Sequence, residues 1–233
     1  MDLGIAGRTA LVVGGSGLLG RAVAAALLHE EVRVVLAARN ETRLADAAHS
    51  LDDEPASLTV DTHDPASIQA AVDRLGTVDI LVNTAAPPAQ TLDPARDSDP
   101  GQILEALDAK AGGYLRVMNA VLPHMRASGF GRIVNISGQN AHLTRSVTGA
   151  VRNQAVITAS KALADAHAGT GITINVVNPG TVTADPSPTV SPATGGESTP
   201  EQVAALVTFL CSIHAATISG ESIAVGHRVL GVQ

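Results

Sequence analysis

A glycine-rich turn between an apolar run and a helical pattern constrains this chain more than any other feature. Residues Leu11–Gly20 read Leu-Val-Val-Gly-Gly-Ser-Gly-Leu-Leu-Gly, and a helical pattern follows at Arg21–Leu28. Gly14 allows a tight turn, Gly17 lets backbone approach a pyrophosphate, and Gly20 lets the helix pack closely on the strand. Free N–H groups at the helix start then favour phosphate. The stretch predicts a dinucleotide-binding turn, with a turn that binds no ligand as the alternative.

The rest of the chain alternates apolar, β-branched runs with helical stretches, which is typical of a parallel sheet covered on both faces. We therefore predict an α/β, single-domain Rossmann fold over residues 1–233, a doubly wound parallel sheet of about seven strands with helices on both faces. The expected strands are Thr9–Val13, Val32–Ala37, Ser57–Val60, Ile80–Asn83, Arg132–Ser137, Thr173–Asn178 and Ser222–Val225.

Three helix starts carry a clear local signal, an N-cap residue followed by proline. They are Asp64-Pro65, Asp99-Pro100 and Thr199-Pro200. Proline is tolerated at the first helical position because its missing N–H would have no partner there. Two stretches, Pro87–Pro100 and Pro186–Ser198, are expected to be loops because of their composition.

Composition excludes several classes of protein. A net charge of −7 and a pI near 5.5 argue against nucleic acid or an anionic membrane as a partner. The single cysteine, Cys211, rules out an intrachain disulfide and fits a reducing compartment. No apolar run reaches the roughly 18 residues that span a bilayer, and no secretory signal is visible. We expect a cytoplasmic protein that acts on a small molecule and holds no metal.

The end of the second strand indicates the cofactor. In such a sheet, ligands bind at the carboxyl ends of the strands, and an acidic residue after the second strand would bind the ribose of NAD. This chain has Ala38-Arg39-Asn40 there. A guanidinium suits a 2′-phosphate, so NADP is favoured. The alternative is that Arg39 is a solvated residue before a helix that Asn40 caps.

Six motifs in order resemble the short-chain dehydrogenase/reductase family over nearly the whole chain. They are the glycine turn, Asp61, Asn83–Ala86, Leu122–Met125, Gly131–Ser137 and Asn178–Gly180. The resemblance implies a nicotinamide cofactor. The residues expected to surround it are Gly14, Ser16, Gly17, Leu19, Gly20, Arg39, Asn40, Asp61, Thr62, Asn83, Thr84, Ala85, Pro179, Gly180 and Val182.

The resemblance also implies an active site of a Tyr, a Lys four residues later, a Ser and an Asn. Aligning the family's Lys with Lys161 puts Ile157 at the Tyr position. The helix must then run back along a strand of about 20 Å, which takes about 13 residues, and only Ala162–Ala168 are left. Moving the alignment by about two turns puts Gly149 at the Tyr position and Asn153 at the Lys position, and we prefer this register.

Neither register has a Tyr at the position of the proton donor. In the preferred one Gly138, preceded by Ser137, stands at the Ser position, and Lys110 stands at the Asn position. We take Lys110, Ser137 and Asn153 as the candidate catalytic residues. A partly desolvated lysine can be a tuned acid. The alternative for Lys110 is a side chain that reaches solvent or pairs with a carboxylate such as Asp108.

Three further residues are weaker candidates. His142 can act as an acid, although a lone loop histidine is more often a surface residue. Tyr114, one turn after Lys110, is better explained by core packing. Arg152 can bind cofactor ribose or a substrate carboxylate, or remain solvated at a helix start.

Two functions fit this pattern. The first is an NADP(H)-dependent oxidoreductase with a non-standard active site, acting on a small carbonyl or an activated alkene, whose enolate needs mainly charge stabilisation. The second is a catalytically silent NADP(H)-binding member that acts as a sensor or partner subunit, and a fainter third is an isomerase or a lyase. The resemblance also implies a homodimer or homotetramer formed by helices at about Gln102–Ala127 and Val151–Ala168.

Overall fold

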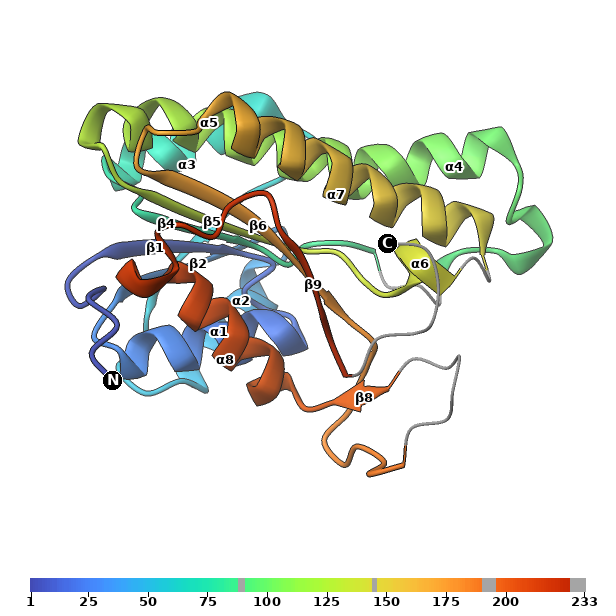
Figure 1. The fold of residues 1–233 in the computed structure, drawn as a ribbon, viewed down its shortest axis with the longest axis horizontal. Helices are drawn as coiled ribbons and strands as arrows, with labels where there is room; N and C mark the ends of the chain where they lie inside the picture. Colours follow the sequence, from blue (N-terminus) through green and yellow to red (C-terminus); the bar gives the residue numbers. More distant parts are fainter. Residues whose placement is uncertain (88–90, 144–145, 190–195, 227–233) are drawn as a thin grey trace.

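The computed structural model describes residues 1–87, 91–143, 146–189 and 196–226, and it contains one seven-stranded parallel sheet with the strand order β3-β2-β1-β4-β5-β6-β9 (Figure 1). This confirms the predicted fold class. The strands are β1 (Thr9–Val13), β2 (Arg33–Ala38), β3 (Ala56–Thr59), β4 (Ile80–Asn83), β5 (Gly131–Ile136), β6 (Ile172–Pro179) and β9 (Ser222–Val225). Each predicted strand is present within two residues of its expected bounds.

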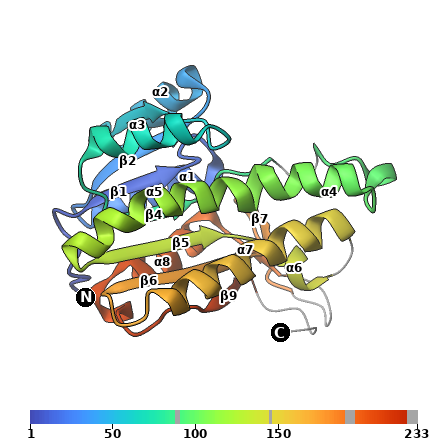
Figure 2. The same ribbon diagram turned by 90° about the horizontal axis from the view of Figure 1, so that it is seen from above.

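Helices cover both faces of the sheet (Figures 1 and 2). The helices are α1 (Leu18–His29), α2 (Glu41–His49), α3 (Pro65–Leu75), α4 (Pro100–Leu107), α5 (Gly113–Ser128), α6 (Asn140–Leu143), α7 (Val147–Ala166) and α8 (Pro200–Cys211). Side chains alternate along β1, so Leu11 and Val13 pack with α3, α5 and α7. Ala10 and Val12 pack on the other face with α1, α2 and α8. The doubly wound arrangement follows from this alternation of apolar side chains.

The predicted helix starts are confirmed by their capping contacts. The side chain of Asp64 accepts a hydrogen bond from Ala66 N, and that of Asp99 accepts one from Gln102 N. At the start of α8, Thr199 and Gln202 form a reciprocal capping box. Each contact satisfies an N–H group that a helix leaves without an internal partner.

Two expectations about irregular segments need correction. The single long helix expected from residue 102 to 127 consists of α4, a π-helical segment η3 (Asp108–Gly112) and α5. A π-helical turn inserts one extra residue, which periodicity averaged over a long window does not reveal. The segment expected as a loop before α8 contains β8 (Glu197–Ser198), which pairs with β7 (Thr181–Val182). Pairs of two residues are too short to show alternation, and residues 190–195 of that loop lie outside the described part.

The strand order places a crevice at one edge of the sheet. β1 pairs with β2 on one side and with β4 on the other, so the chain leaves the end of β1 where the strand order reverses. Ligands bind outside the carboxyl ends of strands at such a point. Across the residues that the structure describes, no helix is long and apolar enough to cross a membrane, and no cluster of metal-binding side chains occurs.

Candidate cofactor pocket and active site

A cavity of about 300 Å³ lies at this reversal point, beside the carboxyl ends of β1, β2 and β4. It is lined by Val13, Gly14, Ser16, Gly17, Ala38, Arg39, Arg43, Val60, Thr62, His63, Thr84, Ala85, Ala86, Pro87 and Ala109. Much of the set expected around the cofactor therefore lines one cavity, namely Gly14, Ser16, Gly17, Arg39, Thr62, Thr84 and Ala85.

The glycine turn at this cavity requires glycine at two positions. Gly14 has a φ of +89°, and a Cβ atom there would lie 2.6 Å from the backbone nitrogen of Ala85. A Cβ atom on Gly20 would lie 2.2 Å from the carbonyl oxygen of Gly14. Because both contacts involve backbone, neither can be relieved by a side-chain movement.

The first turn of α1 has the features of a phosphate site. Its N-cap residue, Gly17, provides no side-chain cap, and the first turn contains no acidic residue. The N–H groups there therefore remain free for a ligand, and the positive end of the helix dipole favours an anion. Together with the close backbone approach at Gly14 and Gly20, this geometry fits a dinucleotide pyrophosphate.

Two arginines line the side of the cavity next to the end of β2. Arg39 is exposed and, among the residues described, forms no ion pair. Arg43, one helical turn further along, lines the same cavity and was not expected from the sequence. The spacing of four residues could have indicated it. Asn40 lies outside the lining, and its side chain caps α2 by accepting a hydrogen bond from Arg43 N at 2.9 Å.

Asp61 follows β3 at the rim of the cavity, and its neighbour His63 lines it. The Oδ1 atom of Asp61 accepts a hydrogen bond from His63 N at 3.0 Å and lies 3.2 Å from His63 Nδ1. The backbone N–H of His63 is the main reason why the pKa of Asp61 lies below its ordinary value. Sequence reasoning missed His63, since a lone histidine in a loop carries no signal of its own.

Asn83 lies in the interior at the end of β4. Its Nδ2 donates to Asn135 Oδ1 at 2.8 Å, and Asn135 Nδ2 donates to Ser160 Oγ at 2.9 Å. This chain of polar contacts ties β4 and β5 to the middle of α7. Asn83 is fully buried, so the structure gives its side chain a role in joining elements beneath the cavity.

The remaining residues expected around the cofactor lie outside the cavity lining. Leu19 and Val182 are half-buried and pack against the apolar core. Gly180 N donates to Val225 O at 3.0 Å, which fixes the chain after β6. Pro179 ends β6, and its carbonyl oxygen accepts a hydrogen bond from Gln139 N at 3.0 Å, just after the end of β5.

Lys110 is the centre of a second group of residues. It lies in the π-helical segment η3 and is 5% exposed. Its Nζ donates to the carbonyl oxygen of Ser137 at 2.9 Å and to Asn153 Oδ1 at 2.8 Å. Burial, and secondarily the charge of Arg152, lowers the pKa of Lys110 to about 7. The alternative of a solvated or carboxylate-paired lysine is therefore wrong.

Ser137 and Asn153 hold Lys110 in place. The hydroxyl of Ser137 donates to the backbone carbonyl of Asn153 at 2.9 Å, which ties the end of β5 to α7. Its proton is therefore engaged in this contact. A Cβ atom on Gly138 would lie 3.3 Å from Asn153 Nδ2 and 3.9 Å from Pro179 O. The end of β6 therefore lies close to Gly138 and Asn153.

The position of Lys161 bears on the choice between the two registers. Lys161 is exposed, and its Nζ pairs with the carboxylate of Asp165 on the outer side of α7. The preceding Ser160 contacts Asn135 in the interior, well along the sheet. The α7 residue that contacts Lys110 is Asn153, which favours the register that places Asn153, and not Lys161, at the position of the family's lysine.

The weaker candidates have different surroundings. Tyr114 is buried, and its hydroxyl donates to Ile136 O at 3.1 Å, so it belongs to the core. His142 lies in α6 and, within the described residues, its imidazole makes no hydrogen bond. A Cβ atom on Gly149 would lie 3.0 Å from Ser146 Oγ. A side chain at position 149 would therefore lie in tight contact with the N-cap residue of α7.

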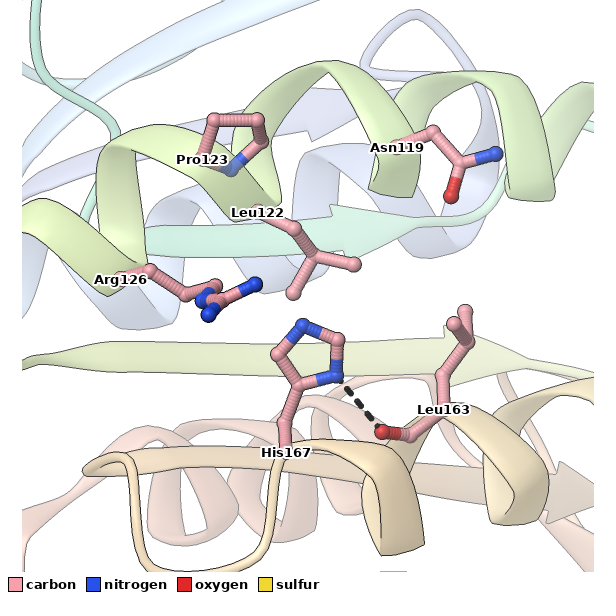
Figure 3. A pocket seen from close by; sticks show the side chains of 6 residues that line it. All are labelled: Asn119, Leu122, Pro123, Arg126, Leu163 and His167. Atoms are coloured by element: carbon pink, nitrogen blue, oxygen red, sulfur yellow. Dashed lines mark hydrogen bonds between the residues drawn. The ribbon is translucent and has the colours of Figure 1, made fainter.

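A separate cavity of about 410 Å³ lies between α5 and α7, away from the carboxyl ends of the strands (Figure 3). The residues that line it are Asn119, Leu122, Pro123, Arg126, Leu163 and His167. His167 Nδ1 lies 2.9 Å from the carbonyl oxygen of Leu163, and the Arg126 side chain extends toward the same ring (Figure 3).

The family model for short chain dehydrogenase matches residues 8–194 of the chain. The chain is 31% identical over 183 residues to an uncharacterized oxidoreductase of Staphylococcus epidermidis, covering 75% of this chain and 78% of that protein. It is 30% identical to the BbsC subunit of (2S)-[(R)-hydroxy(phenyl)methyl]succinyl-CoA dehydrogenase from Thauera aromatica, over 93% and 92% of the two chains. It is 29% identical to the 3-oxoacyl-[acyl-carrier-protein] reductase FabG of Salmonella typhimurium, over 93% and 95%.

A solved structure of similar fold is that of a variant of the actinorhodin polyketide ketoreductase with NADPH. It has a TM-score of 0.79 and 27% sequence identity, and it covers 94% of this chain and 95% of that one. The shared sheet, the glycine turn at the reversal point and these relatives lead to one conclusion. The chain belongs to the short-chain dehydrogenase/reductase family.

Proposed function

We propose that this protein is an NADP(H)-dependent oxidoreductase that reduces a small carbonyl compound or an activated alkene, with Lys110 in place of the usual tyrosine. The observation that carries the proposal is the fixed position of the Lys110 ammonium. It is buried at the carboxyl end of β5 by contacts with Ser137 O and Asn153 Oδ1. A buried amine with a pKa of about 7 can exchange a proton near neutral pH.

The cofactor side of the proposal rests on the cavity at the glycine turn. Gly14, Gly17 and the start of α1 would hold the pyrophosphate. Arg39 and Arg43, which line this cavity, would bind the 2′-phosphate. Arg39 is available for it, because Arg39 forms no ion pair with a carboxylate among the described residues. NADPH, when bound, supplies the hydride. The structure of the similar ketoreductase was solved with NADPH, which supports this choice of nucleotide.

Lys110 has one donor left for substrate. An ammonium carries three N–H groups, and two of them are engaged with Ser137 O and Asn153 Oδ1. The third can stabilise the oxygen of a developing alkoxide or enolate and pass a proton to it. Lys110 is the proposed catalytic residue. Ser137 and Asn153 are positioning residues, because their contacts fix the ammonium and the helix beside it.

The test compares two lysine variants. Lys110→Met should keep NADPH affinity, measured by nucleotide fluorescence, and should lower the rate of reduction by about 10²–10⁴-fold on a panel of ketones and enones. Lys161→Met is the matched control, because Lys161 is exposed on α7, and it should keep the wild-type rate. Unchanged activity in Lys110→Met would reject Lys110 as the catalytic residue.

A catalytically silent NADP(H)-binding subunit is the second candidate. It is favoured by Gly149, which leaves no phenol at the family's proton-donor position, and by the name of one relative, which is a subunit of a dehydrogenase. The same measurements separate the two functions. Tight NADPH binding with no turnover on any carbonyl or enone of the panel would favour the silent subunit.

We also propose a homodimer or homotetramer, as expected from the family resemblance. The contact would involve the outer side of α5 and α7, where the cavity of Figure 3 opens. Small residues on α7, such as Ala155 and Ala159, would permit close approach of a second copy. Ala159→Arg should convert the assembly to a smaller species in sedimentation velocity, and a monomeric wild type at micromolar concentration would contradict the proposal.

A further inference from the structure

A second buried cation lies beside Lys110, and the proposed reaction leaves it without a role. Arg152 precedes Asn153 on α7 and is 4% exposed. Its NH1 donates to Pro87 O at 3.2 Å, while its Nε is buried and has no hydrogen-bond partner among the described residues. Buried polar groups in proteins are usually hydrogen-bonded, so an unpaired guanidinium N–H calls for an explanation.

Among the described residues, no carboxylate pairs with either of these two cations, Lys110 and Arg152. The titratable group that faces Arg152 is Tyr114, and burial raises the pKa of Tyr114, so the phenol stays neutral. The charge of Arg152 disfavours the charged form of Lys110. Buried charges are normally paired, and arginine cannot escape the cost by losing its proton.

The two cations lie next to the cofactor cavity. Pro87, whose carbonyl Arg152 contacts, lines that cavity, and so does Ala109, the neighbour of Lys110. Lys110 has one unused N–H, and Arg152 has its unpaired Nε–H. An anion at this place would satisfy the Nε–H of Arg152 and would be attracted by the nearby charge of Lys110, while the third N–H of Lys110 stays available for the oxygen that is reduced. A carboxylate suits the guanidinium, because its oxygens accept charge-assisted hydrogen bonds.

We infer that Lys110 and Arg152 form an anion site and that the substrate is a carbonyl compound or activated alkene carrying a carboxylate. The inference rests on the proposed oxidoreductase function and narrows its substrate class. Arg152 binds the carboxylate through its Nε–H, and the remaining N–H of Lys110 is kept for the oxygen that is reduced.

The experiment uses the wild-type protein saturated with NADP⁺, which cannot reduce a ketone. Acetoacetate and its neutral analogue acetoacetamide are titrated into this complex by calorimetry. Acetoacetate should bind at least about 10-fold more tightly, the effect expected of a charge-assisted hydrogen bond. Equal binding of the acid and the amide, or binding of neither to the NADP⁺ complex, would overturn the inference and leave the oxidoreductase proposal standing. Failure of NADP⁺ itself to bind would instead reject the oxidoreductase proposal.

Two arginine variants locate the anion. Arg152→Gln should abolish the preference for the acid over the amide, while Arg126→Gln should keep it, because Arg126 is exposed in the separate cavity between α5 and α7. A preference that survives in Arg152→Gln would place the anion elsewhere and overturn the assignment. Arg152→Gln could instead lose affinity for NADP⁺ and keep the wild-type ratio of acetoacetate to acetoacetamide affinity. That result would assign Arg152 to cofactor binding and would also overturn the anion site.

Proton uptake provides a second readout, whose main measurement is made on the wild-type protein. At pH 8 most Lys110 side chains are neutral, since the pKa is about 7, and a bound carboxylate favours the charged form. Binding of acetoacetate should therefore take up protons, measured from calorimetry in two buffers of different ionisation enthalpy. Lys110→Met should show no uptake. Absence of uptake in the wild type would remove Lys110 from the anion site.

Discussion

The two ends of the ligand-binding region differ in how closely they follow the family pattern. At the glycine turn, Gly14 and Gly20 stand where backbone contacts exclude any larger residue. Around Lys110, Gly149 and Asn153 stand where the family resemblance, in the register that we prefer, expects the usual tyrosine and lysine. The glycine turn is constrained by backbone packing that few residue types satisfy. The surroundings of Lys110 depend on side chains, and side chains can exchange roles when their charges and hydrogen bonds are preserved.

The largest expected effect concerns the glycine turn. Gly20→Ala places a Cβ atom 2.2 Å from Gly14 O, so it should lower NADPH affinity by more than about 100-fold and destabilise the fold by about 3 kcal/mol or more. Gly17→Ala is the matched variant, since the nearest atom to its Cβ lies 3.3 Å away. Its loss of stability should be clearly smaller than that of Gly20→Ala, because this contact is tight but does not overlap as the Gly20 contact does. NADPH titration and urea unfolding measure both, and a stable, NADPH-binding Gly20→Ala would show that the turn can shift.

The second test exchanges Lys110 and Asn153, whose side chains contact each other in the interior. Asn153→Lys alone brings a second ammonium against Lys110 in a buried place and should cost about 3 kcal/mol of unfolding free energy. Adding Lys110→Asn restores one lysine and one amide, and the double variant should recover to within about 1 kcal/mol of the wild type. Urea unfolding of the four proteins gives the coupling. Additive effects would contradict a direct interaction between the two positions.

A smaller effect is expected on the preference for NADPH over NADH, which we assign to the arginines beside the 2′-phosphate. Arg39→Ala should narrow the difference between NADPH and NADH binding by about 1–3 kcal/mol, the scale of a charge-assisted contact. Arg43→Ala should narrow it as well, because Arg43 lines the same cavity. Fluorescence titration with both nucleotides provides the measurement. Equal wild-type affinity for NADPH and NADH would remove the assignment of both arginines.

The smallest effect is a pH dependence of stability. Lys110 loses its proton near pH 7 in the fold and near pH 10.5 when unfolded, so the unfolded chain binds more protons between these values. Stability should therefore rise with pH in this window, by at most about 1.4 kcal/mol per unit. We expect wild type to gain stability over Lys110→Met between pH 7 and 8.5. Parallel pH profiles of the two proteins would show that Lys110 is charged in the fold.

Much of the architecture was predictable because it depends on local patterns. The apolar runs predicted every strand of the large sheet, and residues such as Asp64 and Thr199 predicted helix starts through contacts within one turn. The small β7–β8 pair was missed, since two-residue strands carry no periodicity. Among the expected cofactor residues, Asn40 and Asn83 are engaged in capping and in the interior, because short-range motifs do not show where a side chain finds its partner.

The amino-acid sequence by itself determined the doubly wound sheet and the glycine turn, since periodicity and backbone requirements act over short stretches. The tertiary structure alone decided what Lys110 does. Its contacts, Ser137 and Asn153, lie 27 and 43 residues away along the chain. The choice of Asn153 over Lys161 and the burial of Arg152 likewise depend on how α7 packs against the sheet. Desolvation and charge compensation are properties of a packed environment, and they arise only when distant segments meet.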